Sequence, residues 1–176
     1  MELRDRDLLL RPWRTDDLDA IVVACQDPEI SRWIPFVPRP YTRHDAETYV
    51  RGCLDSGPER LPFAIVDAET DALLGSIDLR LNEHRYRGHV GYWVAADARG
   101  RGVCTTALRL VTRMALEQLR VQRMELITDP DNVASQRVAE KVGYTREGVL
   151  RAHLLHPDGR LRDSLMFSLL PGELRD

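Results

Sequence analysis

The stretch "GYWVAADARGRGVCTTAL", residues 91–108, joins an apolar run to a long amphipathic segment through two glycines. The apolar run His89–Ala95 predicts a strand. Apolar residues recur at helical spacing farther on, which predicts a helix over Thr105–Arg120. Glycine loses the most conformational freedom on folding, so packing alone does not explain Gly100 and Gly102 just before a helix.

A strand, a glycine loop and a helix start together form a geometry suited to phosphate. The first turn of a helix leaves about four backbone N–H groups without partners, and its dipole is positive at that end. The side chains of Arg99 and Arg101 would add charge-assisted donors, unless they simply point into water. No GK[ST] ending follows, and Thr105 stands where a dinucleotide fingerprint requires glycine, so neither ATP nor NAD is indicated.

Around this stretch the chain alternates between strand and helix patterns. Further strands are predicted at Leu8–Trp13, Leu61–Asp67, Ala72–Leu81, Met124–Thr128, Tyr144–Leu154 and Leu161–Leu169. Further helices are predicted at Asp16–Gln26 with Thr15 as cap, at Arg43–Asp55 with a Thr42/Asp45 capping box, and at Asn132–Val142. The pattern predicts a single domain, 1–176, of mixed α/β class, with a largely antiparallel twisted sheet of about seven strands flanked by four helices.

Residues 27–42 contain four prolines, which predict an ordered loop between two helices. The loop carries Trp33, Phe36 and Tyr41. These aromatic side chains either cover the core or form the wall of a substrate pocket, and the sequence leaves both roles open.

Composition narrows the classes of function. The chain has 176 residues and a formal net charge of −3, which gives no electrostatic case for nucleic acid as a partner. The three cysteines are scattered and form no CxxC pair, so neither a disulfide framework nor a metal site is expected. No run approaches the roughly 20 apolar residues of a membrane span, and the charged N-terminus is unlike a secretory signal. The expectation is a cytoplasmic protein with no membrane partner.

The stretch 91–108 resembles the acyl-CoA-binding segment of the GNAT superfamily of N-acetyltransferases, whose signature is [Q/R]-x-x-G-x-[G/A]. Arg99 and Gly102 match this signature, whereas Cys104 replaces the final glycine or alanine. The cysteine side chain is small enough for the backbone still to approach a ligand, but it departs from the pattern.

A second segment, "DPDNVASQRVAEKVGYTREG" (residues 129–148), resembles the family's N-x-x-[A/S]…G-[F/Y] region through Asn132, Ser135, Gly143 and Tyr144. Both segments, the start "LLLRPWRTDDLDAI" and the end "DGRLRDSLMFSLL" are similar to the RimJ/RimL branch of the family. The resemblance covers nearly the whole chain and implies a single GNAT-like domain.

The resemblance implies a set of contacts to coenzyme A or acetyl-CoA. Trp93 and Val94 would pair with the pantetheine arm where their strand splays from its neighbour, and Asn132 would bind the amide portion. Arg137 and Lys141 either meet the adenosine phosphates or form a solvated helix face. The pyrophosphate would be held by the backbone of Arg99, Gly100, Arg101, Gly102, Val103, Cys104 and Thr105.

Acetylation of an amine requires a neutral amine, a polarised thioester and a proton for the leaving thiolate. In this family the amine attacks directly, so no cysteine nucleophile is needed. Many members use a tyrosine as the acid, but its position here is Ala139. The branch often has serine at Ser135, which is therefore expected to donate to the thiolate or to orient a water there. The alternative for Ser135 is a local backbone hydrogen bond.

The general base is less defined. The family often has glutamate two residues before the "GY" of the central strand, and His89 occupies that place. Histidine titrates near neutrality, which suits a general base. His153 is a second candidate, and the remaining alternatives are bulk water or an amine that arrives neutral.

The resemblance implies an acetyl-CoA-dependent N-acetyltransferase whose acceptor is a primary amine, either a protein N-terminus or a small molecule. The missing tyrosine and the Cys104 substitution leave open a non-catalytic acyl-CoA-binding or regulatory module. A third reading is an acyltransferase that prefers another acyl-CoA, such as succinyl-CoA. Relatives in the family often dimerise, so a homodimer also stays open.

Overall fold

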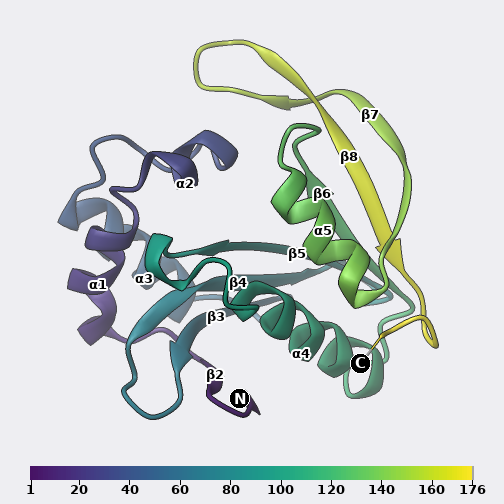
Figure 1. The fold of residues 1–176 in the computed structure, drawn as a ribbon, viewed down its shortest axis with the longest axis horizontal. Helices are drawn as coiled ribbons and strands as arrows, with labels where there is room; N and C mark the ends of the chain where they lie inside the picture. Colours follow the sequence, from purple (N-terminus) through teal and green to yellow (C-terminus); the bar gives the residue numbers. More distant parts are fainter. Residues whose placement is uncertain (176) are drawn as a thin grey trace.

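The computed structural model describes residues 1–175, and the last residue of the predicted domain, 176, lies outside them. One eight-stranded sheet, with strand order β1-β2-β3-β4-β5-β6-β8-β7, forms the centre (Figure 1). The strands are β1 (Leu3–Asp5), β2 (Leu8–Arg11), β3 (Arg60–Asp67), β4 (Leu73–Leu81), β5 (Arg87–Val94), β6 (Arg123–Thr128), β7 (Thr145–Leu155) and β8 (Leu161–Leu169). Within residues 1–175 the α-helices are α1 (Leu18–Ala24), α2 (Pro28–Trp33), α3 (Arg43–Leu54), α4 (Val103–Glu117) and α5 (Val133–Val142).

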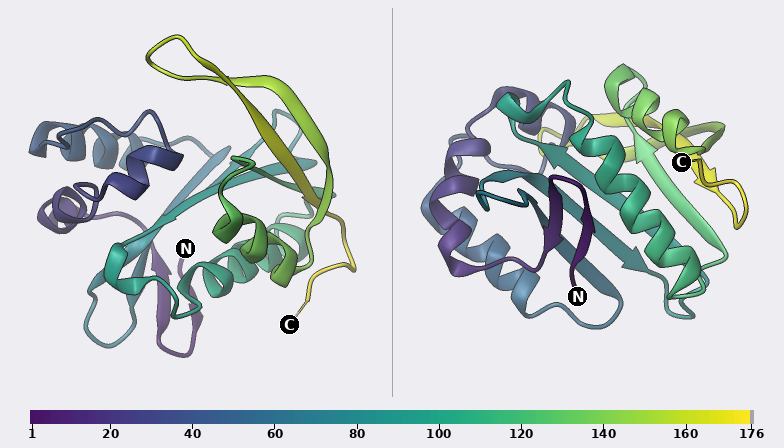
Figure 2. Two further views of the ribbon diagram at one scale, coloured as in Figure 1. Left: turned by 45° about the horizontal axis from the view of Figure 1, so that its top comes forward. Right: turned by 60° about the horizontal axis from the view of Figure 1, so that its bottom comes forward.

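Two apolar clusters cover the two faces of the sheet. On one face, α4 lies over the strands (Figure 2). Its buried Leu108 and Val111 belong to one apolar cluster with Ile77 and Val90 of the sheet. On the other face, α1 and α3 contribute Ile21 and Val50 to a second cluster, together with other buried side chains. The sheet residues in this second cluster come from β2, β3, β4 and β5, so α1 and α3 cover only that part of the face.

The sheet is antiparallel except at β5 and β6. These two parallel strands are joined through α4, and they pair from Arg87↔Arg123 to Val90↔Leu126. Strand β5 continues for four more residues, to Val94, still paired with β4 but beyond its last pair with β6. The sheet therefore opens between β5 and β6 from Gly91 onward.

A buried arginine ties the N-terminal strands together. The Arg11 side chain is 1% exposed and donates from Nη1 and Nη2 to the Asp17 carboxylate at 2.9 and 2.8 Å. Its Nε donates to Asp71 Oδ1 at 2.8 Å. Strand β2, the turn that leads into α1 and the turn between β3 and β4 are thereby linked through one guanidinium.

The predicted α/β class and the largely antiparallel sheet are confirmed, with eight strands and five α-helices among the described residues in place of about seven and four. The extra strand, β1, has only three residues and too little pattern to be recognised. The prediction of a loop throughout 27–42 is wrong, because Pro28 occupies the first turn of α2 and Asp27 caps it by accepting from Glu29 N at 3.0 Å.

Of the two helix caps discussed next, the predicted cap of α3 is confirmed and the predicted cap at Thr15 is not. The predicted capping box at α3 is confirmed: Thr42 N donates to Asp45 Oδ2 at 2.8 Å, and Asp45 N donates to Thr42 Oγ1 at 3.2 Å. The prediction of Thr15 as a cap is wrong. Thr15 begins a short 3-10 turn instead, and Asp17 accepts from Arg14 N at 2.8 Å.

Candidate active site

The glycine stretch forms the connection from β5 to α4. Gly100 (φ 74°) and Gly102 (φ 80°) both adopt the left-handed region that favours glycine, and Gly102 caps α4. The first helical hydrogen bond of α4 runs from Thr106 N to Gly102 O at 3.0 Å. The amides of residues 103–105 precede that bond, so they are the helix-start donors that a phosphate could use.

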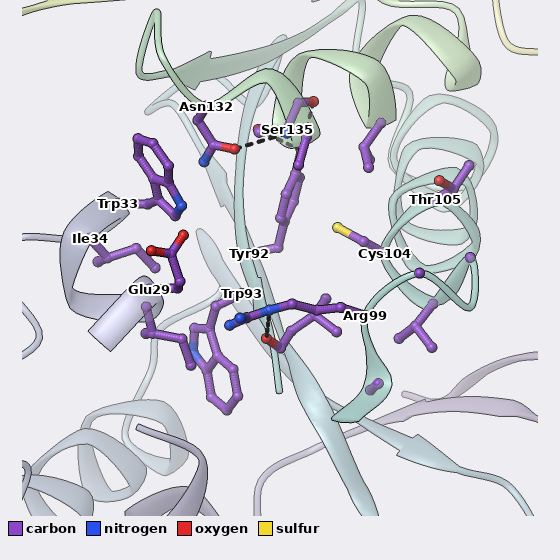
Figure 3. Close-up of a pocket in the computed structure, with 18 of the residues that line it drawn as sticks. Glu29, Trp33, Ile34, Tyr92, Trp93, Arg99, Cys104, Thr105, Asn132 and Ser135 are labelled. Carbon is purple, nitrogen blue, oxygen red and sulfur yellow. Dashed lines mark hydrogen bonds between the residues drawn. The ribbon is translucent and has the colours of Figure 1, made fainter. Parts of the chain in front are cut away.

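A cavity of about 350 Å³ lies between this connection, the end of β5, the start of α5 and helix α2 (Figure 3). Most of the residues predicted to contact coenzyme A line it. They are Trp93, Val94, Arg99, Gly100, Gly102, Val103, Cys104, Thr105, Asn132, Ser135 and Lys141. Arg101 instead lines a different cavity with Asp67 and Arg109. Arg137 is exposed and lies outside the residues that line the first cavity.

The Arg99 side chain braces the cavity wall. Its Nε donates to Val94 O at 3.2 Å, and its Nη2 forms an ion pair with Asp27 Oδ2 at 2.5 Å. The guanidinium therefore joins the glycine loop to β5 and to α2. The Arg99 side chain itself lines the cavity, together with the backbone of the loop (Figure 3).

A hydrogen-bonded group crosses the cavity from β5 to α5. Asn132 caps α5 by accepting from Ser135 N at 3.0 Å, and the Ser135 hydroxyl lies 3.0 Å from the Tyr92 hydroxyl. The Cys104 thiol, at the start of α4, also interacts with the Tyr92 hydroxyl. Burial raises the pKa of Tyr92 and of Cys104, so both groups are protonated at neutral pH.

Sequence analysis missed Tyr92. Its position on β5 alternates with those of Gly91 and Trp93, so its ring points to the face that α4 and α5 cover. Ala139, where the family pattern has tyrosine, lies on α5 itself and is fully buried. Strand alternation was the signal that could have found a tyrosine hydroxyl beside Ser135.

A second cavity, of about 410 Å³, opens on the other face of β5. The two cavities share Trp33, Tyr92, Trp93 and Ser135, and they meet where β5 and β6 separate. Two ligands could therefore approach one point from opposite faces of the sheet.

The loop aromatics divide between the two roles left open by the sequence. Trp33 lines both cavities, and Phe36 lines the second. Tyr41 is buried among the side chains of α1 and α3. Trp33 and Phe36 thus form pocket wall, and Tyr41 forms core.

Both candidate bases line the second cavity. Burial lowers the pKa of His89 from its ordinary value of 6.5; Arg80 and His153 lower it further, while Glu125 and Asp78 oppose them. The imidazole of His89 is therefore neutral at pH 7. His153 Nδ1 lies 3.2 Å from Ser164 Oγ, on the hairpin of β7 and β8.

The two cysteines other than Cys104 line neither of these cavities. Cys25 and Cys53 are buried in the cluster between α1, α3 and the sheet. Between residues 1 and 175, no group of three or more His, Cys, Asp or Glu side chains could hold a metal ion. No helix in that range is long and apolar enough to cross a membrane.

Comparisons with known proteins agree with this architecture. Residues 7–145 match a family profile described as "Acetyltransferase (GNAT) domain". Over 172 residues the chain is 27% identical to "Putative ribosomal N-acetyltransferase YdaF" from Bacillus subtilis (strain 168). The alignment covers 94% of this chain and 90% of that protein. This similarity supports the predicted resemblance to the RimJ/RimL branch.

Solved structures give the same result. A GCN5-related N-acetyltransferase from Brucella melitensis superposes with a TM-score of 0.85 at 25% identity, over 98% of this chain and 80% of that one. RimL in complex with coenzyme A superposes with a TM-score of 0.86 over 97% of this chain and 98% of that one. At 16% sequence identity, this similarity shows a shared fold and nothing more. The chain therefore belongs to the family of acetyltransferase (GNAT) domains and is an acetyltransferase, as its segments around Gly102 and Asn132 predict.

Proposed function

We propose that this acetyltransferase transfers an acetyl group from acetyl-CoA to a primary amine, which attacks the thioester directly. The observation that carries the proposal is the meeting of two cavities at the opening between β5 and β6, beside Ser135. Such an arrangement brings a donor and an acceptor together from opposite faces without an intermediate on the protein.

The residues of the first cavity fit acetyl-CoA. A Cβ at Gly100 or Gly102 would meet nothing within 4 Å, so the space over the loop is open to a ligand. The amides of residues 103–105 would hold the pyrophosphate, and the free edge of β5 at Trp93 and Val94 would pair with the pantetheine arm. Acetyl-CoA supplies the activated acetyl group. The raised pKa of the half-buried Cys104 keeps it protonated, so it offers no thiolate, which agrees with direct attack.

The other roles follow from position. The Ser135 hydroxyl, held by Tyr92, would donate a proton at the point where the cavities meet. His89, neutral in the second cavity, would accept the proton that the amine releases.

Thermal unfolding with acetyl-CoA, CoA, succinyl-CoA, NAD and ATP tests the binding part of the proposal. A ligand present at about 100 times its dissociation constant stabilises the folded state by roughly 2.7 kcal/mol, and we expect that shift only with the CoA compounds. Release of free CoA on addition of an amine tests transfer. Binding without turnover on any amine would identify a non-catalytic module instead.

The pH dependence of kcat/KM tests His89. Since the pKa of His89 lies below 6.5, we expect the rate to stay level through neutral pH and to fall only below about pH 6.5, as the imidazole becomes protonated. His89→Gln should lower the rate about 100-fold and abolish that acid limb. If His89→Gln keeps the acid limb of the wild-type pH profile, the general base is His153 or water instead.

Gly75 on β4 supports the edge of the first cavity. An added Cβ there would lie 2.4 Å from the Trp93 carbonyl oxygen, which is far closer than van der Waals contact. We expect Gly75→Ala to displace the end of β5, to lower the free energy of unfolding by about 1–3 kcal/mol and to weaken acetyl-CoA binding.

Gly52→Ala on α3 is the matched control for this variant, because its Cβ would meet nothing within 4 Å. It should leave binding unchanged and stabilise the helix slightly. Thermal unfolding with and without acetyl-CoA measures both variants. Wild-type stability and affinity in Gly75→Ala would show that the strand end is not held as the structure describes.

A further inference from the structure

The second cavity carries more positive than negative groups. Three arginines and two aspartates line it, and each arginine forms an ion pair with one of the aspartates. Asp78 Oδ2 accepts from Arg60 Nε at 2.9 Å and from Arg80 Nε at 3.2 Å. Asp129 Oδ2 accepts from Arg162 Nη1 at 2.8 Å. Asp129 balances Arg162, whereas Asp78 pairs with two arginines, so the cavity as a whole has one positive charge in excess. This excess favours a ligand whose net charge is negative.

Two polar atoms of residues that line this cavity are left without partners. Asp78 Oδ1 and Arg162 Nε are buried, and within residues 1–175 neither has a hydrogen-bond partner. A carboxylate oxygen can only accept and a guanidinium N–H can only donate, so one ligand could satisfy both with two different groups. Unpaired buried polar atoms are costly, and a ligand that pairs them recovers that cost.

The two atoms come from opposite sides of the sheet opening. Asp78 lies on β4 directly across from Gly91 of β5, and Arg162 lies on β8, beyond β6. The floor between them is open, because a Cβ at Gly91 would meet nothing within 4 Å. A ligand can therefore lie over Gly91, close to Trp93 and Ser135, which line the same cavity.

We infer that the acceptor is a small primary amine that also carries a carboxylate. This inference rests on the proposed function and names the substrate class of its second cavity. The amine N–H donates to Asp78 Oδ1, and the carboxylate accepts from Arg162 Nε. Asp78 and Arg162 are thus the residues that determine acceptor specificity.

A panel of matched amines tests the inference. It contains the ω-amino acids with one to five methylenes, their primary amides and the diamines of the same lengths. The series of lengths varies the distance between the amine and the second group of each compound. With acetyl-CoA saturating, we expect kcat/KM of the best amino acid to exceed that of its amide at least about tenfold, since the amide leaves Arg162 without an anion. The diamines should be the poorest substrates.

Variants assign this preference to residues. Arg162→Gln should bring the ratio of acid to amide close to one, and Asp78→Asn should lower kcat/KM for every amine at least about tenfold. Arg160→Gln is the matched control on the same hairpin: its side chain is exposed, pairs with Asp158 and lies outside the second cavity. Gly91→Leu should raise KM for the amines by filling the floor. In all four variants an unchanged thermal shift with acetyl-CoA reports an intact fold and donor site.

Several results would overturn the inference. Equal rates for acid and amide, a preference for diamines, or an acid-to-amide ratio that Arg162→Gln leaves unchanged would each do so. Transfer to the N-terminus of peptides but to no member of the panel would also overturn it, while the proposed function would stand. Binding of acetyl-CoA with no transfer to any amine or peptide would overturn both.

Discussion

Replacing Ser135 with alanine is expected to lower kcat about 100-fold or more and to leave the affinity for acetyl-CoA close to that of the wild type. The Ser135 hydroxyl lies 3.0 Å from the Tyr92 hydroxyl at the point where the two cavities meet. Loss of a general acid typically costs a factor of 10² to 10⁴. The cap at Asn132 uses the backbone N–H of residue 135, so the helix start survives the substitution.

Single-turnover measurement of acetyl transfer, together with thermal unfolding, separates chemistry from folding. Tyr92→Phe keeps the ring and removes the hydroxyl that orients Ser135. It should therefore lower kcat by a smaller factor than Ser135→Ala does, and it should shift the pH profile less. Ser31→Ala on α2 is the matched control: Ser31 Oγ donates to Pro28 O within its own helix, and its side chain lines neither cavity. A wild-type kcat in Ser135→Ala would show that Ser135 lines the cavity wall and does not act as the acid.

Asp17→Ala is expected to produce the largest loss of stability. It removes both carboxylate oxygens from the Arg11 guanidinium and leaves the buried cation with the Asp71 carboxylate and the Pro12 carbonyl oxygen as partners. Breaking one side of a buried ion pair costs about 3–5 kcal/mol. For a chain of this size that corresponds to a fall in Tm of roughly 10 °C.

The neighbouring Asp19→Ala provides the comparison. Asp19 is 86% exposed and pairs with Arg43 at the surface, where ion pairs contribute about 0–1 kcal/mol. The double variant Arg11→Met/Asp17→Leu should recover much of the stability that Asp17→Ala loses, because it removes the buried charge itself. Equal losses for Asp17→Ala and Asp19→Ala in denaturant unfolding would contradict the importance of the buried pair.

The local part of the site could be predicted from the sequence. The two glycines before α4 and the Asn132 cap of α5 are decided by neighbouring residues, and both are found in the structure. Helix α2 was missed because prolines at 35, 38 and 40 outweighed the Asp27–Pro28 pair, which is itself a helix-start signal.

The acceptor side could not be predicted in the same way. Asp78 and Arg162 lie 84 positions apart in sequence, and only the strand order places them around one opening. Arg101 illustrates a similar limit at short range. It stands between the two glycines, but their left-handed backbone turns its side chain toward Asp67 and away from the first cavity.

The brace from Arg99 to Asp27 has a consequence for the order in which ligands bind. Helix α2 is fixed to the glycine loop by that ion pair, and its Trp33 borders both cavities. Whichever ligand arrives first restricts the motion of the same indole, so the second ligand meets a surface that is already ordered. Thermodynamic linkage then requires each ligand to raise the affinity of the other by the same factor, whichever of the two binds first.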